Sequence, residues 1–422
     1  MTPLTALVAN RRGEIVELEG YGAAGAAGTD LTPLTVENTV PLPHGAELMY
    51  LPDRHPVVFD PDTGALAPLT ENPYQPGEPL FPVAAFNSPG YLLTRNAAWV
   101  EAEGANPLPL FAYGAVGWGK KGFRTAAIRV DREPRQDLRK MPRSGVVAGI
   151  SAMQSAMPDN RLRAHLETCA LTYGCPAAKN FFLGRYEAPL PTATRCNANC
   201  LGCLSLQAEG GLPCSQDRID FTPSPAEIAE VALTHIRRVP RAVVSFGQGC
   251  EGDPLMAAST IAEAISRIRR ETDAGTINVN TNAGLPDRLD ALFDAGLDSV
   301  RVSLNSVREA SYTAYFRPNY AFADVLSAID RALERGRWVS INYLSLPGFV
   351  DSPEESAALL DFLRDHPVKM IQWRNLNFDP VRYHAVMAGV TPLGQPVGVR
   401  RLLDRVRRDA PDVRHGYFNP HL

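Results

Sequence analysis

Three closely spaced cysteines are the residues of this sequence best suited to chemistry. Cys196, Cys200 and Cys203 form a C-x3-C-x2-C pattern. Three thiolates at this spacing can surround one cubic iron–sulfur cluster, each binding one iron, and leave the fourth iron open to a small-molecule ligand. Zinc sites usually add a second pair of cysteines or histidines, and no cysteine follows Cys250. A zinc site and three cysteines without a metal remain the alternatives.

The elements around this segment alternate in type. From about residue 181 onward, short β-branched or aromatic runs alternate with longer helical patterns. This order favours a parallel sheet with crossover helices, and the three cysteines directly follow its first strand. The six predicted strands are Arg185–Leu190, Ala242–Phe246, Thr276–Asn280, Ser299–Leu304, Val339–Leu344 and Met370–Arg374.

Two helix starts are marked by capping signals. Both Ser224-Pro225-Ala226-Glu227 and Ser352-Pro353-Glu354-Glu355 place a serine three residues before a glutamate, with proline at the first helical position. In such a box the serine accepts a backbone N–H and the glutamate side chain bonds back to the serine N–H. Each segment therefore predicts the first turn of a helix.

The first third of the chain has a different pattern. Short apolar runs are separated by turn signals such as Asp60-Pro61-Asp62-Thr63-Gly64 and Asn87-Ser88-Pro89-Gly90, which favours short strands. We predict a β-rich N-terminal domain over residues 1–140 and a helical and irregular linker over residues 141–180. The α/β unit then spans residues 181–390, and a C-terminal helix and tail span residues 391–422.

The composition is that of an ordinary globular protein of enzyme size. The 422 residues are 45% hydrophobic and 21% charged, and the formal net charge of −4 is too small for general attraction to nucleic acid or anionic membranes. We find no apolar stretch of the roughly 18 residues that a bilayer requires, and no secretory-signal pattern at the N-terminus. We therefore expect a cytoplasmic protein with no membrane partner. An odd number of cysteines, seven, also suits a reducing compartment.

The cysteine segment resembles that of the radical S-adenosylmethionine (radical SAM) enzymes, and the resemblance covers about Phe181 to Asp379. It implies a partial (βα)6 TIM-like barrel, in agreement with the six strands counted above. It also implies that Cys196, Cys200 and Cys203 hold a [4Fe-4S] cluster whose free iron binds S-adenosylmethionine (SAM). An oxygen-sensitive enzyme that cleaves SAM reductively to a 5′-deoxyadenosyl radical is the function we expect, with an electron donor such as flavodoxin or ferredoxin.

The resemblance extends to segments that follow the later strands. The segment Glu251-Gly252-Asp253-Pro254 is similar to the family's GGEP motif but departs from it in the first and third positions, so the alignment of its two acids stays open. Asn278–Gly284 is similar to the TNG segment, and Val302–Ser306 to the VSLD pattern with Asn in place of Asp. The residues that the resemblance implies for SAM binding are Gly247, Gln248, Gly249, Glu251, Gly252, Asp253, Asn280, Ser303 and Asn305.

The other four cysteines have no recognisable cluster spacing. We expect Cys169 and Cys175 to be buried structural residues, while an auxiliary cluster formed by Cys169, Cys175, Cys214 and Cys250 stays open. Cys250 lies inside the expected cofactor loop. It is therefore a candidate catalytic residue that donates a hydrogen atom or carries a thiyl radical.

The substrate is not identified by the sequence. It can be a small molecule, a peptide or an RNA. Peptide or RNA modification is suggested by the segment Lys120–Arg143, which contains nine basic and three acidic residues. A solvated surface explains the same charges more simply. From another class, a non-enzymatic iron–sulfur or zinc protein that binds nucleic acid is the rival hypothesis.

Overall fold

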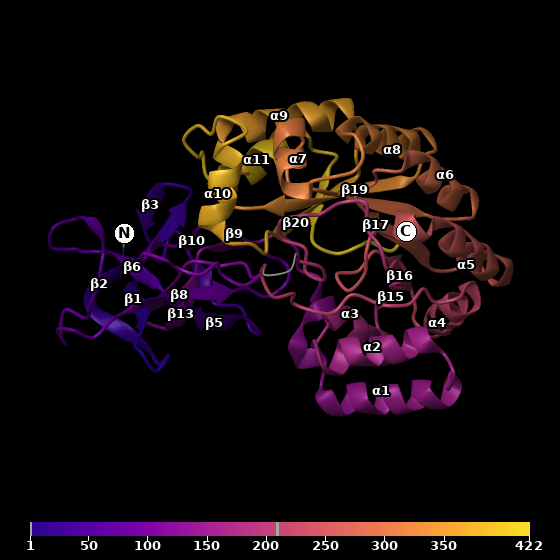
Figure 1. Ribbon diagram of the computed structural model, residues 1–422, viewed down its shortest axis with the longest axis horizontal. Helices are drawn as coiled ribbons and strands as arrows, with labels where there is room; N and C mark the ends of the chain where they lie inside the picture. Colours follow the sequence, from indigo (N-terminus) through magenta and orange to yellow (C-terminus); the bar gives the residue numbers. More distant parts are fainter. Residues whose placement is uncertain (1, 208–210) are drawn as a thin grey trace.

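The computed structural model describes residues 2–207 and 211–422 and contains two groups of elements side by side (Figure 1). The N-terminal group, in indigo, consists of antiparallel strands. The second group, from magenta to yellow, is a parallel sheet with helices along its outer side. The predicted fold class, a partial barrel with a β-rich N-terminal domain, is confirmed.

The N-terminal domain is built on twelve connected strands and a separate two-stranded pair. The hairpin between β12 and β13 turns at Lys120 and Lys121, because Gly119 pairs with Gly122. The strands are β1 (Thr5–Ala9), β2 (Ile15–Ala27), β3 (Asp30–Pro33), β4 (Val40–Pro41), β5 (Glu47–Tyr50), β6 (Arg54–Phe59), β7 (Leu66–Pro68), β8 (Phe81–Phe86), β9 (Tyr91–Leu93), β10 (Asn96–Ala97), β11 (Trp99–Glu101), β12 (Val116–Gly119), β13 (Gly122–Thr125) and β14 (Ala127–Arg129).

The second sheet has seven strands, all parallel, in the same order as in the sequence. Parallel neighbours in sequence order place every strand's carboxyl end at one edge, where barrel active sites gather. The strands are β15 (Glu187–Pro189), β16 (Val243–Phe246), β17 (Thr276–Thr281), β18 (Ser299–Leu304), β19 (Trp338–Ser345), β20 (Met370–Asn375) and β21 (Arg414–Gly416). The first six match the predicted strands to within two residues.

The seventh strand comes from the C-terminal tail and was not predicted. β21 has only three residues and no apolar run, so it lacks the alternation by which strands are found in a sequence. It forms because the edge of β20 offers free backbone groups, and Met370, Ile371 and Gln372 pair with it. The tail thereby becomes part of the barrel wall.

Helices line the outer side of this sheet, and three more precede it. α1 and α2 pack with α3 and α4 next to β15. The helices are α1 (Arg143–Ala156), α2 (Arg161–Leu171), α3 (Pro176–Phe182), α4 (Pro225–Arg238), α5 (Ala258–Glu271), α6 (Pro286–Asp294), α7 (Glu309–Phe316), α8 (Phe322–Glu334), α9 (Pro353–Asp365), α10 (Pro380–Ala388) and α11 (Val399–Asp409), with short 3-10 turns η1 (Pro134–Gln136), η2 (Leu138–Lys140) and η3 (Pro254–Ala257). No helix among the described residues is long and apolar enough to cross a membrane.

One of the two predicted capping boxes is complete. Ser224 and Glu227 form both bonds at the start of α4. At α9, Ser352 accepts the N–H of Glu355, but the Glu355 carboxylate accepts hydrogen bonds from Ser306 and Arg308. The carboxylate is buried, and these tertiary partners replace the local bond that the box predicts.

A buried ion pair joins the two groups of elements. Arg54 of β6 and Asp379, which precedes α10, are both almost fully buried and lie 3.4 Å apart. Asp379 also accepts the N–H groups of Val381 and Arg382 and therefore caps α10. A second connection is made by Asn375. The position of the N-terminal domain against the barrel is thus set by one buried ion pair and by part-buried hydrogen bonds.

The substitution Asp379→Ala should destabilise the protein by about 3–5 kcal/mol, because it removes a helix cap and the buried carboxylate beside Arg54, which leaves only the partly exposed Glu101 as counter-charge. Urea unfolding followed by circular dichroism measures the change. Glu101→Ala is the matched control, since Glu101 binds the same guanidinium at 2.9 Å but is 30% exposed, and it should cost about 1 kcal/mol or less. Equal losses of stability in the two variants would contradict the conclusion that the buried Arg54–Asp379 pair holds the two groups of elements together.

Candidate functional site

The carboxyl ends of the barrel strands open into a cavity of about 550 Å³. All three motif cysteines lie on its wall, together with the loop after β16 and inward-facing residues of β17 to β20. Phe86 and Asn87 of the N-terminal domain and Tyr417 to Asn419 of the tail complete the lining. The cavity therefore draws on every part of the fold.

The cysteine loop is held by backbone bonds to the end of α7. Asn199 donates to Phe316 and Leu201 donates to Tyr315, each over 3.0 Å. Gly202 lies so close to Tyr315 that an added Cβ would be 2.9 Å from the phenol oxygen. These contacts give the loop one defined path.

The chemistry of the three thiols fits a metal cluster. Burial raises the pKa of Cys196 to about 11 and that of Cys200 well above its usual value, so a nearby cationic centre is needed to hold them as thiolates. Arg218 donates to the Cys203 sulfur over 3.5 Å, and the amide of Asn282 lies 4.0 Å from the Cys196 sulfur. Such donors to cluster sulfurs are typical of iron–sulfur sites.

The Glu251 carboxylate accepts four backbone N–H groups. Thr192 and Ala193, which precede the cysteine loop, donate over 2.8 and 2.9 Å. Gly247 and Gln248 of the loop after β16 donate over 2.7 and 2.8 Å. Burial raises the pKa of Glu251 to about 7, and the four donors oppose this shift. The carboxylate therefore connects the two loops.

Asp253 has a similar connecting position. Its carboxylate accepts the Thr281 hydroxyl at 2.8 Å and the backbone N–H of Asn282 at 2.7 Å. It also accepts the N–H of Leu255 at the start of η3. The two acids whose alignment the sequence left open thus both bind backbone, Glu251 toward β15 and Asp253 toward β17.

At two positions of the loop after β16, only glycine fits, because a backbone carbonyl lies close to its Cα. An added Cβ at Gly247 would lie 1.8 Å from the Asn280 carbonyl oxygen, and the φ of Gly247 is +80°. An added Cβ at Gly252 would lie 1.9 Å from the Arg195 carbonyl oxygen. The loop therefore packs backbone against backbone, and residues 247–249 line the cavity.

The structure brings most of the predicted cofactor residues to the cavity. Gly247, Gln248, Gly249, Glu251, Gly252, Asp253, Asn280 and Ser303 all line it. Asn280 uses its amide nitrogen to hold the carbonyls of Phe246 and Gly247. Its role in this structure is to position the loop.

Asn305 lies outside the described cavity lining. Its amide donates to the Ser311 carbonyl and the Tyr383 hydroxyl, each over 3.1 Å. β18 ends at Leu304, and beyond that point the chain turns toward α7. The strand alternation that would place Asn305 beside Ser303 therefore no longer applies.

Several cavity residues were not recognised in the sequence. Arg301 of β18 donates to the neutral amide of Gln372 over 2.9 Å, and Arg374 of β20 lies 3.8 Å from the ring centre of Tyr417. The Nε atoms of both arginines are buried without a hydrogen-bond partner among the described residues. Burial lowers the pKa of Arg301 to about 9. Arg301 and Ser303 are two residues apart on β18 and therefore point to the same side of the strand. This spacing was the sequence signal that could have identified Arg301 as a cavity residue.

The C-terminal tail reaches the floor of the same cavity. The Asn419 amide donates to Glu187, Ser245 and Asn280, and its oxygen accepts from Gln372. Arg135 of the basic segment donates to the Asn419 carbonyl over 2.8 Å. The sequence carries no signal for this contact, which joins residues 284 positions apart.

Residues 190–360 match the radical SAM superfamily. The GTP 3′,8-cyclase of Chlorobaculum tepidum is 26% identical over 226 residues, which cover 53% of this chain and 62% of the cyclase. The GTP 3′,8-cyclase 2 of Mycobacterium bovis is 34% identical over 34% of this chain and 37% of that protein. The FeMo cofactor biosynthesis protein NifB of Klebsiella pneumoniae is 26% identical over 39% of this chain and 38% of that protein. The chain thus matches under two thirds of each relative's length.

Among solved structures, a radical SAM methyltransferase from Sphaerobacter thermophilus is similar with a TM-score of 0.38 and 20% identity, over 53% of this chain and 63% of that one. SuiB from Streptococcus suis is similar with a TM-score of 0.39 and 13% identity, over 56% of this chain and 50% of that one.

Gly247→Ala should destabilise the protein by at least about 3 kcal/mol and abolish binding of SAM, because the methyl group collides with a backbone carbonyl. Thermal unfolding and calorimetric titration with SAM measure the two effects. Gly336→Ala is the matched control: Gly336 also has a positive φ, +66°, but an added Cβ meets no atom within 4 Å. Its cost should be about 1 kcal/mol, with unchanged SAM binding.

Arg218→Met should lower the reduction potential of the reconstituted cluster by on the order of 60 mV, the one-electron equivalent of a charge-assisted hydrogen bond worth about 1.4 kcal/mol. A redox titration followed by electron paramagnetic resonance measures the potential. Arg237→Met removes an exposed arginine of α4 that pairs with Glu271 and should leave the potential unchanged. An unaltered potential in the Arg218 variant would show that its contact with Cys203 does not tune the cluster.

Proposed function

Because residues 190–360 place this chain in the radical SAM superfamily, whose members are enzymes that use a [4Fe-4S] cluster and SAM, we propose that it abstracts hydrogen from a polar, anionic small molecule. The observation that carries the proposal is the position of Cys196, Cys200 and Cys203 on one wall of the barrel cavity. When bound there, the cluster supplies the electron that cleaves SAM to methionine and a 5′-deoxyadenosyl radical.

The chain's own residues have three tasks in this proposal. The three cysteine thiolates hold the cluster, and the guanidinium of Arg218 stabilises the charge on the Cys203 sulfur. The backbone of Gly249 and the side-chain oxygen of Gln248 bind the methionyl part of SAM, since the N–H of Gly247 is already bonded to Glu251 and its carbonyl to Asn280. Their positions are fixed from behind by Glu251, Asp253 and Asn280, which makes these three positioning residues.

In this proposal the outer parts of the fold limit the access of water to the cavity. Phe86 and Asn87 reach it from the N-terminal domain, and Tyr417 and Phe418 reach it from the tail. A dry cavity protects a reactive radical from side reactions and strengthens the polar contacts that orient the substrate. The N-terminal domain therefore serves, in this proposal, to close the open side of the partial barrel.

The protein reconstituted anaerobically with iron and sulfide should release 5′-deoxyadenosine from SAM when dithionite is added. Cys196→Ser, Cys200→Ser and Cys203→Ser should each reduce this release by at least about a thousandfold, since each removes one iron ligand. Liquid chromatography of the products measures it. Cys214→Ser, which changes an exposed cysteine, is the control and should leave release unchanged. Undiminished release from the three motif variants would overturn the proposal.

The substrate class rests on two cavity arginines. Arg301 and Arg374 are half-buried residues of the cavity wall whose Nε atoms are buried and unpartnered among the described residues, and a partly desolvated cation gains from a counter-charge. A phosphate or carboxylate of the substrate supplies it in a geometry that guanidinium forks favour. GTP is the first candidate, because several relatives are named GTP 3′,8-cyclases.

GTP should bind to the reconstituted protein, and Arg301→Met and Arg374→Met should each weaken binding by about ten- to a hundredfold, the loss of a charge-assisted contact. Calorimetric titration measures the affinity, and Arg237→Met is the exposed control. Uncoupled release of 5′-deoxyadenosine should persist in both cavity variants, so a failure of GTP to bind disproves this substrate without disproving SAM cleavage.

The peptide or RNA alternative has less support from the basic segment. Arg135 is buried against the tail, and Arg124 donates to Val36 and to both oxygens of Thr39. Internal partners therefore occupy two of the cations that the alternative uses.

Flavodoxin or ferredoxin is our proposal for the electron donor.

A further inference from the structure

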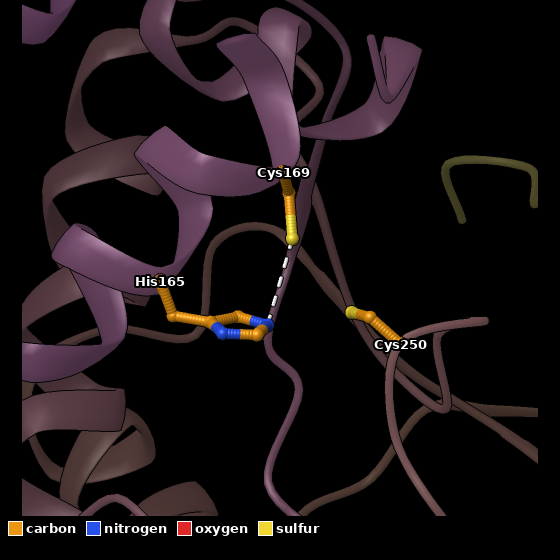
Figure 2. A group of neighbouring side chains, drawn as sticks. All are labelled: His165, Cys169 and Cys250. Carbon is orange, nitrogen blue, oxygen red and sulfur yellow. Dashed lines mark hydrogen bonds between the residues drawn. The ribbon is translucent and has the colours of Figure 1, made fainter. Parts of the chain in front are cut away.

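A second group of soft ligand atoms lies outside the cofactor cavity. His165 and Cys169 project from α2, and Cys250 projects toward them from the loop after β16 (Figure 2). The Nε2 atom of His165 lies 3.5 Å from the Cys169 sulfur. The three ligand atoms all lie within 4.8 Å of one another.

Local structure explains why these side chains converge. His165 and Cys169 are four residues apart on α2, so both occupy one face of the helix. Phe221 packs edge-on against the His165 ring. Cys250 points away from the cavity, whereas its neighbours Gly249 and Glu251 line the cavity. The loop thus presents backbone to one side and a thiol to the other.

The spacing of the three atoms fits a tetrahedral metal ion. Zinc binds sulfur at about 2.3 Å and imidazole nitrogen at about 2.0 Å, which places its ligand atoms about 3.5 to 3.8 Å apart. The His165 to Cys169 distance already has this value, and the remaining separations need only a small side-chain movement. Among the common divalent ions, zinc is the one best suited to a donor set of two thiolates and one imidazole.

The burial of the group also favours a metal. Cys169 is 2% and Cys250 is 6% exposed, and isolated thiolates at such positions are costly. One Zn²⁺ with two thiolates and a neutral imidazole carries no net charge. A metal therefore removes the cost of placing these ligands in the interior.

We propose that His165, Cys169 and Cys250 bind one zinc ion, with a water molecule as the fourth ligand, at a site separate from the three-cysteine cluster. The ion connects α2 to the loop whose opposite side, Gly247 to Gly249, lines the cofactor cavity. Its role is to hold that loop, and this proposal does not depend on the reaction proposed above.

The full-length variant Cys196→Ser/Cys200→Ser/Cys203→Ser, which lacks the cluster ligands, is titrated with Co²⁺ under anaerobic conditions. We expect uptake of one equivalent, with a near-ultraviolet thiolate-to-cobalt charge-transfer band and intense visible bands of tetrahedral Co²⁺. One equivalent of Zn²⁺ should then remove both signals, because zinc binds thiolate sites of this geometry more tightly.

In the same background, His165→Ala and Cys250→Ser should each weaken Co²⁺ binding by more than about a hundredfold, the upper range for loss of an outer-shell partner. Cys214→Ser is the matched control, because Cys214 is exposed and lies outside the group. Its affinity should equal that of the background variant.

A second measurement uses the unsubstituted protein, so that poor folding of a variant does not decide the result. Bound Zn²⁺ should protect Cys169 and Cys250 from alkylation, as read by mass spectrometry, while Cys214 reacts fully. Absence of protection, or Co²⁺ uptake that survives His165→Ala, would overturn the proposal. A Cys169–Cys250 disulfide, or iron and sulfide retained in the triple variant, would replace it by a redox pair or by an auxiliary cluster.

Discussion

A single buried carboxylate with four amide donors holds the two cofactor loops together. Glu251 binds the N–H groups of residues 192 and 193 on one side and of residues 247 and 248 on the other. Direct backbone bonds from Gly252 to Ala193 and from Asp253 to Arg195 join the same two loops. The cluster ligands and the backbone proposed for SAM sit at opposite ends of this connection. The geometry between them therefore depends on the Glu251 side chain together with these backbone bonds.

The barrel interior differs from that of a barrel filled by apolar layers. Glu187, Ser245, Asn280 and Gln372 meet the tail residue Asn419 in one hydrogen-bonded network. A network of this kind is costly when incomplete, and the C-terminal tail supplies the partner that completes it. The polar floor also suits a ligand with many hydrogen-bonding groups. The same polar network thus completes the interior and forms part of the cavity wall.

Much of the site was predictable because its signals are local. The three cysteines, the glycines at 247 and 252 and the strand-end residues Asn280 and Ser303 occur in short patterns, and all of them line the cavity. Asn305 was placed by the same reasoning, but β18 ends one residue earlier and the side chain turns toward Tyr383. Alternation predicts a side chain's direction only as long as the strand continues. His165 and Cys169 carried a usable helical spacing, but Cys250 is far away in the sequence.

The sequence by itself determined the alternation of strands and helices, the close spacing of Cys196, Cys200 and Cys203, and the presence of a glycine-rich loop. These features follow from residue type and short-range periodicity, which act within a few turns of chain. Only the tertiary structure decided that Glu251 and Asp253 face backbone amides, that Arg301 and Arg374 share a cavity, and that the tail forms β21. Each of these depends on burial and on partners tens to hundreds of residues apart, and no local pattern encodes such contacts.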